Sequence, residues 1–497
     1  MLLAGESRAD WRVIPTVNVS ETFTDNVNLQ SGDRKHSQWV TELTPGVILS
    51  GKGRRFQVAA AGQARQFVYS QGQLPDTADH IVEYSFNGRG ELAEDLLFIE
   101  ASASSSPQPV SAFGQMGGAS LYSMGNRTQV KTWRISPFLE QRLGRAANLS
   151  LRYSRDSVET DEYRNRFGNS LGNTISAGLV STDTSAKLGW GLNYVRQDLD
   201  NKLSGSSSSE TASGNLRYAL HSRFALTASV GYDRYDFGGF GGSNAGRNWS
   251  GGFDWTPSAR TRLSASLGRH YFGQTGKLDL THRSRYTVWR IAYDDVVTNS
   301  REQFLLPSTI DTAILLDRLF SATISDPLLR QQAVEAYIRQ TGLPPSLADN
   351  VNYLSNRYFR EKRLQATSAF TRGRSSALVT LYASDRVALS DMQTDSPLLG
   401  SQLATLNNNV RQKGLSLTYN YRVNARTSAV AGADFARHRS LTTGIENDPR
   451  DFRLGMTRQL AKDMRAAVEL RHQRGRVDAT AGDYRENAIS ATLSAQF

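Results

Sequence analysis

The chain has 497 residues, of which 39% are hydrophobic, and its formal net charge is +11. No run approaches the roughly 18–20 apolar residues that a membrane-spanning helix needs, which excludes a helical membrane protein. A membrane β-barrel stays compatible with this composition, because only every second residue of its strands faces lipid. Cysteine is absent, so disulfides and thiolate metal sites are excluded.

The first nine residues differ from the rest of the chain. Residues 1–5 look like the end of an apolar signal core, and Ser7-Arg8-Ala9 fits a small-x-small cleavage site. A complete signal peptide also needs a basic start and a longer apolar core. We interpret residues 1–9 as a signal-peptide remnant or a disordered tail, and we expect the β-barrel to occupy residues 10–497.

From residue 10 onwards the dominant pattern is an alternation of apolar and polar residues. Membrane-barrel strands must alternate in this way, because one face meets lipid and the other meets the lumen. The pattern recurs at 188–194, 224–232, 263–267, 289–293, 415–423 and 489–497. In the last of these segments Phe497 falls on the apolar face, and we interpret it as a membrane-insertion signal whose ring points to lipid.

The connections between these segments sort into two sizes. Short polar turns are predicted at 51–53, 143–145, 182–184, 221–222, 257–259, 373–375, 424–426 and 462–463. Longer loops rich in Gly, Ser and Asn are predicted at 104–127, 159–171, 200–211, 237–247, 391–409 and 440–448. This asymmetry is typical of outer-membrane barrels, with the short turns on the periplasmic side. Counting gives about 22 strands, and an even number places both ends of the chain in the periplasm.

One segment, residues 298–361, breaks the alternation. Asp326-Pro327 followed by residues 328–340 predicts a helix, with Asp at the N-cap, Pro at the first position and Gly342 after the end. Strand parity makes this partly helical insert leave from the extracellular side. The sequence leaves two arrangements open, an extracellular loop and a plug inside the lumen.

Charged residues on the polar faces of the strands are the candidates for the lumen lining. A cation on the lipid face at mid-bilayer costs about 2–4 kcal/mol, so these side chains are expected to point inward. The candidates are Arg152, Lys187, Arg217, Arg262, Arg290, Arg363, Arg422, Arg453, Glu469 and Arg471. Such a wall would attract anions and guide an acidic polymer; alternatively, the arginines pair with acids as structural ladders.

Other classes of function have less support. A soluble propeller predicts a repeated motif at constant spacing, and none is found. The arginines are spread over many strands rather than clustered on a recognisable module, so no nucleic-acid partner is expected. The seven histidines form no motif of a hydrolase or metalloprotease, so we expect no enzyme, no catalytic residue, no metal and no cofactor.

Several short motifs resemble the outer-membrane protein family associated with the PEP-CTERM/exosortase system. They are Asp10-Trp11-Arg12-Val13-Ile14-Pro15, the stretch 21–27 with its Thr-Asp-Asn turn, Tyr271-Phe272-Gly273, 284–289 and Asp326-Pro327-Leu328-Leu329-Arg330. Their order along the chain is also similar. The resemblance implies an outer-membrane location and association with exopolysaccharide gene clusters. It brings no catalytic residues.

Three functions remain open at this point. The first is a pore or export conduit for an anionic polymer or solutes, lined by arginines. The second is a non-conducting scaffold whose extracellular insert binds polysaccharide or a partner, and the third is a surface enzyme. A TonB-dependent receptor is disfavoured, because strands begin near residue 11, where a plug domain would stand. The expected partners are outer-membrane lipid, the barrel-assembly machinery and exopolysaccharide or export components.

Overall fold

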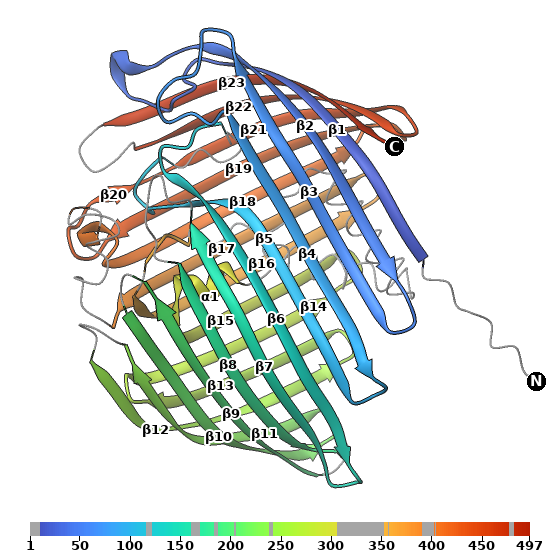
Figure 1. Ribbon diagram of the computed structural model, residues 1–497, viewed down its shortest axis with the longest axis vertical. Helices are drawn as coiled ribbons and strands as arrows, with labels where there is room; N and C mark the ends of the chain where they lie inside the picture. Colours follow the sequence, from blue (N-terminus) through green and yellow to red (C-terminus); the bar gives the residue numbers. More distant parts are fainter. Residues whose placement is uncertain are drawn as a thin grey trace, which may run out of the picture.

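A computed structural model describes residues 10–115, 122–160, 169–182, 187–202, 205–237, 242–305, 352–355, 357–389, 402, 404–476 and 482–497. These residues form a closed antiparallel barrel of 22 long strands (Figure 1). The predicted fold class, an all-β transmembrane barrel, and the predicted strand number are therefore confirmed. The prediction for residues 1–9 lies outside the described residues.

The long strands cover most of the described chain. Their bounds are β1 Asp10–Thr24, β2 Gln38–Lys52, β3 Phe56–Tyr69, β4 His80–Ala93, β5 Leu97–Pro109, β6 Arg127–Leu143, β7 Ala147–Thr160, β8 Ser170–Ser181, β9 Leu188–Asn201, β10 Gly205–His221, β11 Phe224–Asp236, β12 Ser243–Ser258, β13 Thr261–His270, β14 Gly273–Arg283, β15 Thr287–Asn299, β16 Tyr358–Arg372, β17 Ser375–Ala388, β18 Asn409–Arg422, β19 Thr427–Ser440, β21 Arg450–Ala461, β22 Met464–Arg476 and β23 Asp483–Gln496. The shorter elements are a 3-10 helix at Gly32–Arg34, α1 at Ser300–Phe304 and β20 at Glu446–Asn447.

Each long strand pairs with its neighbours in the chain, and β1 pairs with β23 to close the ring. The closing register runs from Thr16 opposite Gln496 to Thr24 opposite Ala488. The backbone N–H of Phe497 donates to the carbonyl of Pro15 at 3.0 Å, and the Phe497 side chain is 76% exposed. A closed ring satisfies the backbone hydrogen bonds of every strand, which is what a membrane environment requires.

The alternation seen in the sequence defines two faces of the wall. Large apolar side chains are exposed at alternate positions, such as Val13 on β1, Leu192 on β9, Leu267 on β13 and Val468 on β22. We call this outward side the lipid face and the opposite side the lumen face. An exposed apolar belt around a closed barrel is stable only in lipid. The protein is therefore an outer-membrane β-barrel.

The two ends of the barrel differ in their connections. The predicted short turns fall at the end where β1 begins and β23 finishes, which is the periplasmic end (Figure 1), except that residues 183 and 184 of the turn predicted at 182–184 lie outside the described residues. The loop predicted at 200–211 is wrong in extent, because β9 reaches Asn201 and β10 already starts at Gly205. The small polar residues there pair with β9 as part of β10. Backbone groups in a barrel wall need hydrogen-bond partners, and small side chains do not prevent this pairing.

The insert between β15 and β16 is shorter than the predicted 298–361. The ladder continues to Thr298 opposite Phe359 and Asn299 opposite Tyr358, so the excursion is 300–357. Its described part comprises α1 and residues 305, 352–355 and 357. The helix predicted at 328–340 lies outside the described residues. No described helix is long and apolar enough to cross a membrane.

Several outer connections pack against the lumen face rather than standing away from the barrel. Val27 from the β1–β2 connection and Tyr122 from the β5–β6 connection form one buried cluster with Val40 and Phe67 of the wall. Tyr69, near the outer end of β3, also packs on this inner cluster. Alternation determines this side, because Tyr69 shares a face with Phe67.

Candidate functional site at the outer mouth of the lumen

The base of the insert is a five-residue helix that continues directly from β15. The side chain of Asn299 caps α1 by accepting a hydrogen bond from the backbone N–H of Glu302 at 2.8 Å. Such a cap satisfies one of the free N–H groups of the first turn. Ser300 and Arg301 in this turn are buried. The cap therefore fixes the direction in which α1 leaves the wall.

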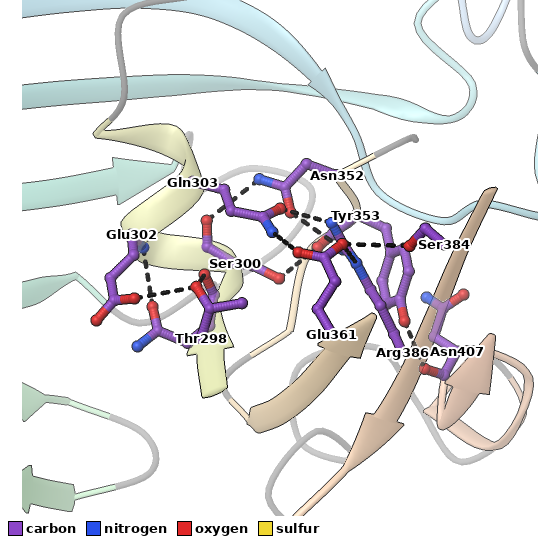
Figure 2. A network of polar contacts seen from close by, with 11 residues as sticks. Thr298, Ser300, Glu302, Gln303, Asn352, Tyr353, Glu361, Ser384, Arg386 and Asn407 are labelled. Carbon is purple, nitrogen blue, oxygen red and sulfur yellow. Dashed lines mark hydrogen bonds and ion pairs between the residues drawn. The ribbon is translucent and has the colours of Figure 1, made fainter. Parts of the chain in front are cut away.

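A polar network joins the base of the insert to the wall strands β16 and β17 (Figure 2). The amide of Gln303 donates to Glu361 at 2.8 Å, and Arg386 donates to Gln303 at 2.6 Å and to Glu361 at 2.9 Å. Asn352 accepts from Arg386 at 3.3 Å and donates to the carbonyl of Ser300 at 3.2 Å. Both ends of the insert are thus held by the same pair of wall residues.

The Arg386–Glu361 pair is almost completely buried. The exposed fractions of the two side chains are 1% and 6%, and the Arg386 guanidinium also lies over the rings of Phe359 and Tyr353. Glu361 accepts a further hydrogen bond from Ser384 at 3.2 Å. Removing one partner of such a buried pair typically costs about 3–5 kcal/mol, because the other charge is left uncompensated.

A second buried pair ties α1 to the lumen face of strands β7 and β8. Arg301 forms an ion pair with Asp156, and their exposed fractions are 6% and 0%. The Arg301 guanidinium also donates to the hydroxyl of Ser170 at 2.8 Å. A Cβ added to Gly172 would lie 2.8 Å from this guanidinium, so a larger residue here would require the Arg301–Asp156 pair to shift. Strands β7 and β8 are far from β15 in the ring, so α1 bridges separate parts of the wall.

A third buried pair holds the β5–β6 connection against the wall near the closing strand. Glu486 of β23 lies 3.2 Å from Arg471 of β22, with exposed fractions of 0% and 7%. The hydroxyl of Tyr122 donates to Glu486 at 2.8 Å, and the hydroxyl of Thr24 on β1 donates to it at 2.7 Å. One carboxylate thus connects the first strand, the last strand and an outer connection.

Apolar side chains fill the space between these polar anchors. Leu305 and Leu354 from the insert pack with Val130 and Val158 of the lumen face. Tyr353 packs with residues of the β5–β6 and β17–β18 connections and with β18 in a neighbouring cluster. The outer mouth of the lumen therefore contains a packed layer that is joined to the wall by the Arg301–Asp156 ion pair. Hydrogen bonds of Gln303 and Tyr122 join it to two further buried ion pairs of the wall.

Glu302 is a partly buried acid in this layer. Burial raises the pKa of the Glu302 carboxyl above its ordinary value, and the hydrogen bond from Thr298 at 3.0 Å opposes that shift. When the pKa of an acid is higher in the packed state than in the open state, the packed state is most stable with the acid protonated. The stability of the packed base is therefore expected to fall as the pH rises from about 4.5, the ordinary value, through the raised value.

The variant Glu302→Gln should remove this pH dependence, because a neutral amide carries no burial penalty for charge. Amide hydrogen exchange in α1 measures the effect at pH values from 4 upward. We expect wild-type exchange to accelerate relative to the variant as the pH rises, and then to level off. A ratio of the two rates that stays constant with pH would contradict the assignment of this dependence to Glu302.

Most of the predicted lumen-lining arginines have acidic partners on the same face. The pairs are Arg152–Glu100 at 2.6 Å, Arg217–Asp254 at 3.7 Å, Arg290–Asp279 at 3.2 Å, Arg453–Asp434 at 3.0 Å and Arg471–Glu486. Arg363 lies on the lumen face of β16 and donates to Gln365 at 3.2 Å. For these positions the structure favours ladders of paired charges over a continuous row of open cations.

Three of the predicted cations are arranged differently. Lys187 directly precedes β9, Arg262 is the second residue of β13 and Arg422 is the last residue of β18. Alternation places all three on the lumen face, at the periplasmic end. Within the described parts of the chain, no acid lies within ion-pair distance of these three cations. Likewise, no described cation lies within ion-pair distance of Glu469 on β22.

Sequence reasoning missed the anchoring residues and one histidine. Asp156, Glu361, Arg386 and Glu486 were not among the candidates, although each lies on an inward-facing strand position. His270, which has no acid close in sequence, lies 2.6 Å from the buried carboxylate of Asp233 on β11. Among the described residues no hydroxyl bonds to the other ring nitrogen of His270, and no group of three or more His, Asp or Glu could hold a metal.

Comparison with known proteins finds likeness at the level of fold. A scan against family models finds no match, and a search of the curated proteins finds none either. Among solved structures the chain is similar to the FrpB iron transporter from Neisseria meningitidis, with a TM-score of 0.52, 10% identity, and coverage of 97% of this chain and 82% of that one. The apoprotein form of FrpB gives a TM-score of 0.50 at the same identity, covering 97% and 81%.

A mutant of the ferric enterobactin receptor PfeA from Pseudomonas aeruginosa, in complex with enterobactin, is also similar. It has a TM-score of 0.49 and 11% identity, and the match covers 97% of this chain and 81% of that one. At these identities the likeness concerns the fold alone. The closed ring and its exposed apolar belt make this chain an outer-membrane β-barrel, and it has its own set of buried anchors at the outer mouth.

Proposed function

We propose that the protein is a gated conduit of the outer membrane, in which the base of the insert closes the outer mouth of the lumen. The observation that carries the proposal is the attachment of α1 to opposite parts of the wall by Arg301–Asp156 and by Gln303 with Arg386–Glu361. A barrel of this strand number encloses a lumen wide enough for a channel unless something fills it. The iron transporter among the similar folds is consistent with a transport role.

Deletion of the insert is expected to open the conduit. Because β15 and β16 pair directly up to Asn299 and Tyr358, replacing residues 300–357 with a short Gly-Ser turn leaves the wall continuous. In planar bilayers we expect steady conductance from the deletion variant and only rare openings from the wild type. A barrel altered at the exposed pair Arg196–Asp198 on the lipid face serves as control. A folded deletion variant that never conducts would refute the conduit and favour the non-conducting scaffold.

We further propose that the cargo is anionic and enters from the periplasm. Lys187, Arg262 and Arg422 lie on the lumen face at the periplasmic end without acidic partners in the described chain, and rings of charge at a pore mouth select ions by sign. An acidic exopolysaccharide fits this chemistry. The resemblance of short motifs to the exosortase-associated outer-membrane family, which implies association with exopolysaccharide gene clusters, motivates that choice of cargo.

Reversal of the three mouth cations should reverse the selectivity of the opened barrel. In the insert-deletion background, Lys187→Glu, Arg262→Glu and Arg422→Glu together should change the preference from anions to cations. The reversal potential in a salt gradient measures the change. Arg234→Glu on the lipid face should leave it unaltered. An opened barrel that prefers cations before any reversal would contradict an anionic cargo while leaving the conduit itself standing.

A further inference from the structure

A row of like charges crosses the lipid face at the outer ends of the last strands. Arg450 of β21 lies directly opposite Arg474 of β22, and Arg474 lies directly opposite Arg485 of β23. All three share the face of the exposed Leu454, Leu470 and Ile489, by alternation along their strands. Within the described chain no acid is in ion-pair distance of the three. Like charges directly opposite one another destabilise a strand pair.

The arrangement continues on the neighbouring pair β18 and β19. Arg411 faces Arg439, and Lys413 faces Arg437. Arg411, Arg437 and Arg439 have acidic neighbours at 2.7 to 3.6 Å. Lys413 has none among the described residues. The outer ends of β18–β23 thus carry more cations than acids. We define the basic rim as Arg411, Lys413, Arg437, Arg439, Arg450, Arg474 and Arg485.

Another part of the same lipid face shows the ordinary arrangement. On β9–β11, Glu210 lies directly opposite Arg196 on one neighbouring strand and Arg234 on the other. Opposite charges therefore alternate across that part of the wall, which stabilises the pairing. The unbalanced basic rim is a local feature of β18–β23 and is not imposed by the barrel.

A groove in the lipid face adjoins the basic rim and is lined by residues of β16–β19 and the start of β21. Its volume is about 520 Å³, and Lys413, Arg437 and Arg450 line its outer end. Asp448, the ion-pair partner of Arg437, also lines it. The remaining wall is mainly apolar and includes Leu364, Leu381 and Phe435. The hydrocarbon chain of a lipid fits the apolar part of the groove. An anionic head group of the same lipid would then contact the cations at its outer end.

We propose that this groove and the basic rim bind a phosphorylated, multiply acylated glycolipid of the outer leaflet. One acyl chain lies along the groove, and the phosphates lie between Lys413, Arg450 and Arg474. Phosphate oxygens accept charge-assisted hydrogen bonds from these cations and remove the repulsion between them. Because the site lies at the extracellular end of the lipid face, a lipid of the outer leaflet can reach it, whereas a lipid of the inner, periplasm-facing leaflet cannot.

The test compares the wild-type barrel in detergent with a triple variant, Lys413→Gln, Arg450→Gln and Arg474→Gln. The matched control is Arg196→Gln with Arg234→Gln, which removes cations from the lipid face of β9 and β11. The probes are bisphosphorylated lipid A and its dephosphorylated form. Binding is measured by native mass spectrometry, and the unfolding temperature is recorded with and without each lipid.

We expect the triple variant to bind bisphosphorylated lipid A about a hundredfold more weakly than the wild type or the control. The lipid-free variant should unfold at a higher temperature than the lipid-free wild type, because the like charges are gone. With lipid the order should reverse. Equal binding by variant and wild type, or equal wild-type binding of both lipid forms, would overturn the proposal. So would a lipid-free variant that unfolds at a lower temperature.

Discussion

Replacing Asp156 with alanine is expected to detach the base of the insert from the wall. Within the described chain, Arg301 would then keep its bonds to Ser170 and to the backbone while its charge stays buried. Leaving a buried charge unpaired costs about 3–5 kcal/mol. Hydrogen exchange of the α1 amides should therefore accelerate more than about a hundredfold, because local opening becomes cheaper. Bilayer recordings should show openings that are rare in the wild type.

Two comparison variants make this result specific. Asp198→Ala removes an acid from an ion pair whose side chains are about half exposed, and such pairs contribute little. It should change neither exchange nor conductance. The double variant Asp156→Leu with Arg301→Met removes both charges, and replacement of a whole buried pair is often neutral. If the double variant opens as much as Asp156→Ala, the buried charge is not the cause.

Replacing Glu486 with alanine should weaken the closure of the barrel itself. This carboxylate accepts from Thr24 on β1, from Tyr122 and from Arg471 and Gln473 on β22. Its loss leaves the Arg471 guanidinium buried beside the seam between the first and last strands, at a cost of about 3–5 kcal/mol. The temperature at which the folded barrel changes mobility in detergent gels should fall markedly. Hydrogen exchange should increase first in β1 and β23.

The matched control for Glu486 is Glu469→Ala on the neighbouring strand. Glu469 also points inward, and within the described chain it takes part in no ion pair. Its removal should leave the gel transition nearly unchanged. A second variant, Glu486→Leu with Arg471→Met, should recover much of the lost stability. A Glu486→Ala barrel as stable as the wild type would show that the seam does not depend on this carboxylate.

Asp156 at the mouth and Glu486 at the seam are expected to control different properties of the barrel. Asp156 acts on the insert and should change conductance without changing the wall. Glu486 connects the wall strands and also holds Tyr122, so its loss should lower barrel stability first. Measuring both properties in both variants separates closure of the mouth from closure of the ring.

The sequence by itself determined the wall of this protein. Alternation from residue 10 to Phe497 is a local property, because each residue's side depends only on its position along its own strand. It therefore predicted the lipid and lumen faces, the number of strands, the sides of the short and long connections and the inward position of Arg152 or Arg471. The same reasoning located the insert to within a few residues of its true ends.

The tertiary structure alone decided what the inward residues do. Arg152 meets Glu100, 52 positions earlier, and Arg301 meets Asp156, 145 positions earlier. Such partners depend on the register between strands and on outer connections that fold back over the lumen, and neither is visible in a local pattern. The alternation places a charge inside the barrel, whereas only the packing of distant segments determines whether that charge is open to a solute or holds the mouth closed.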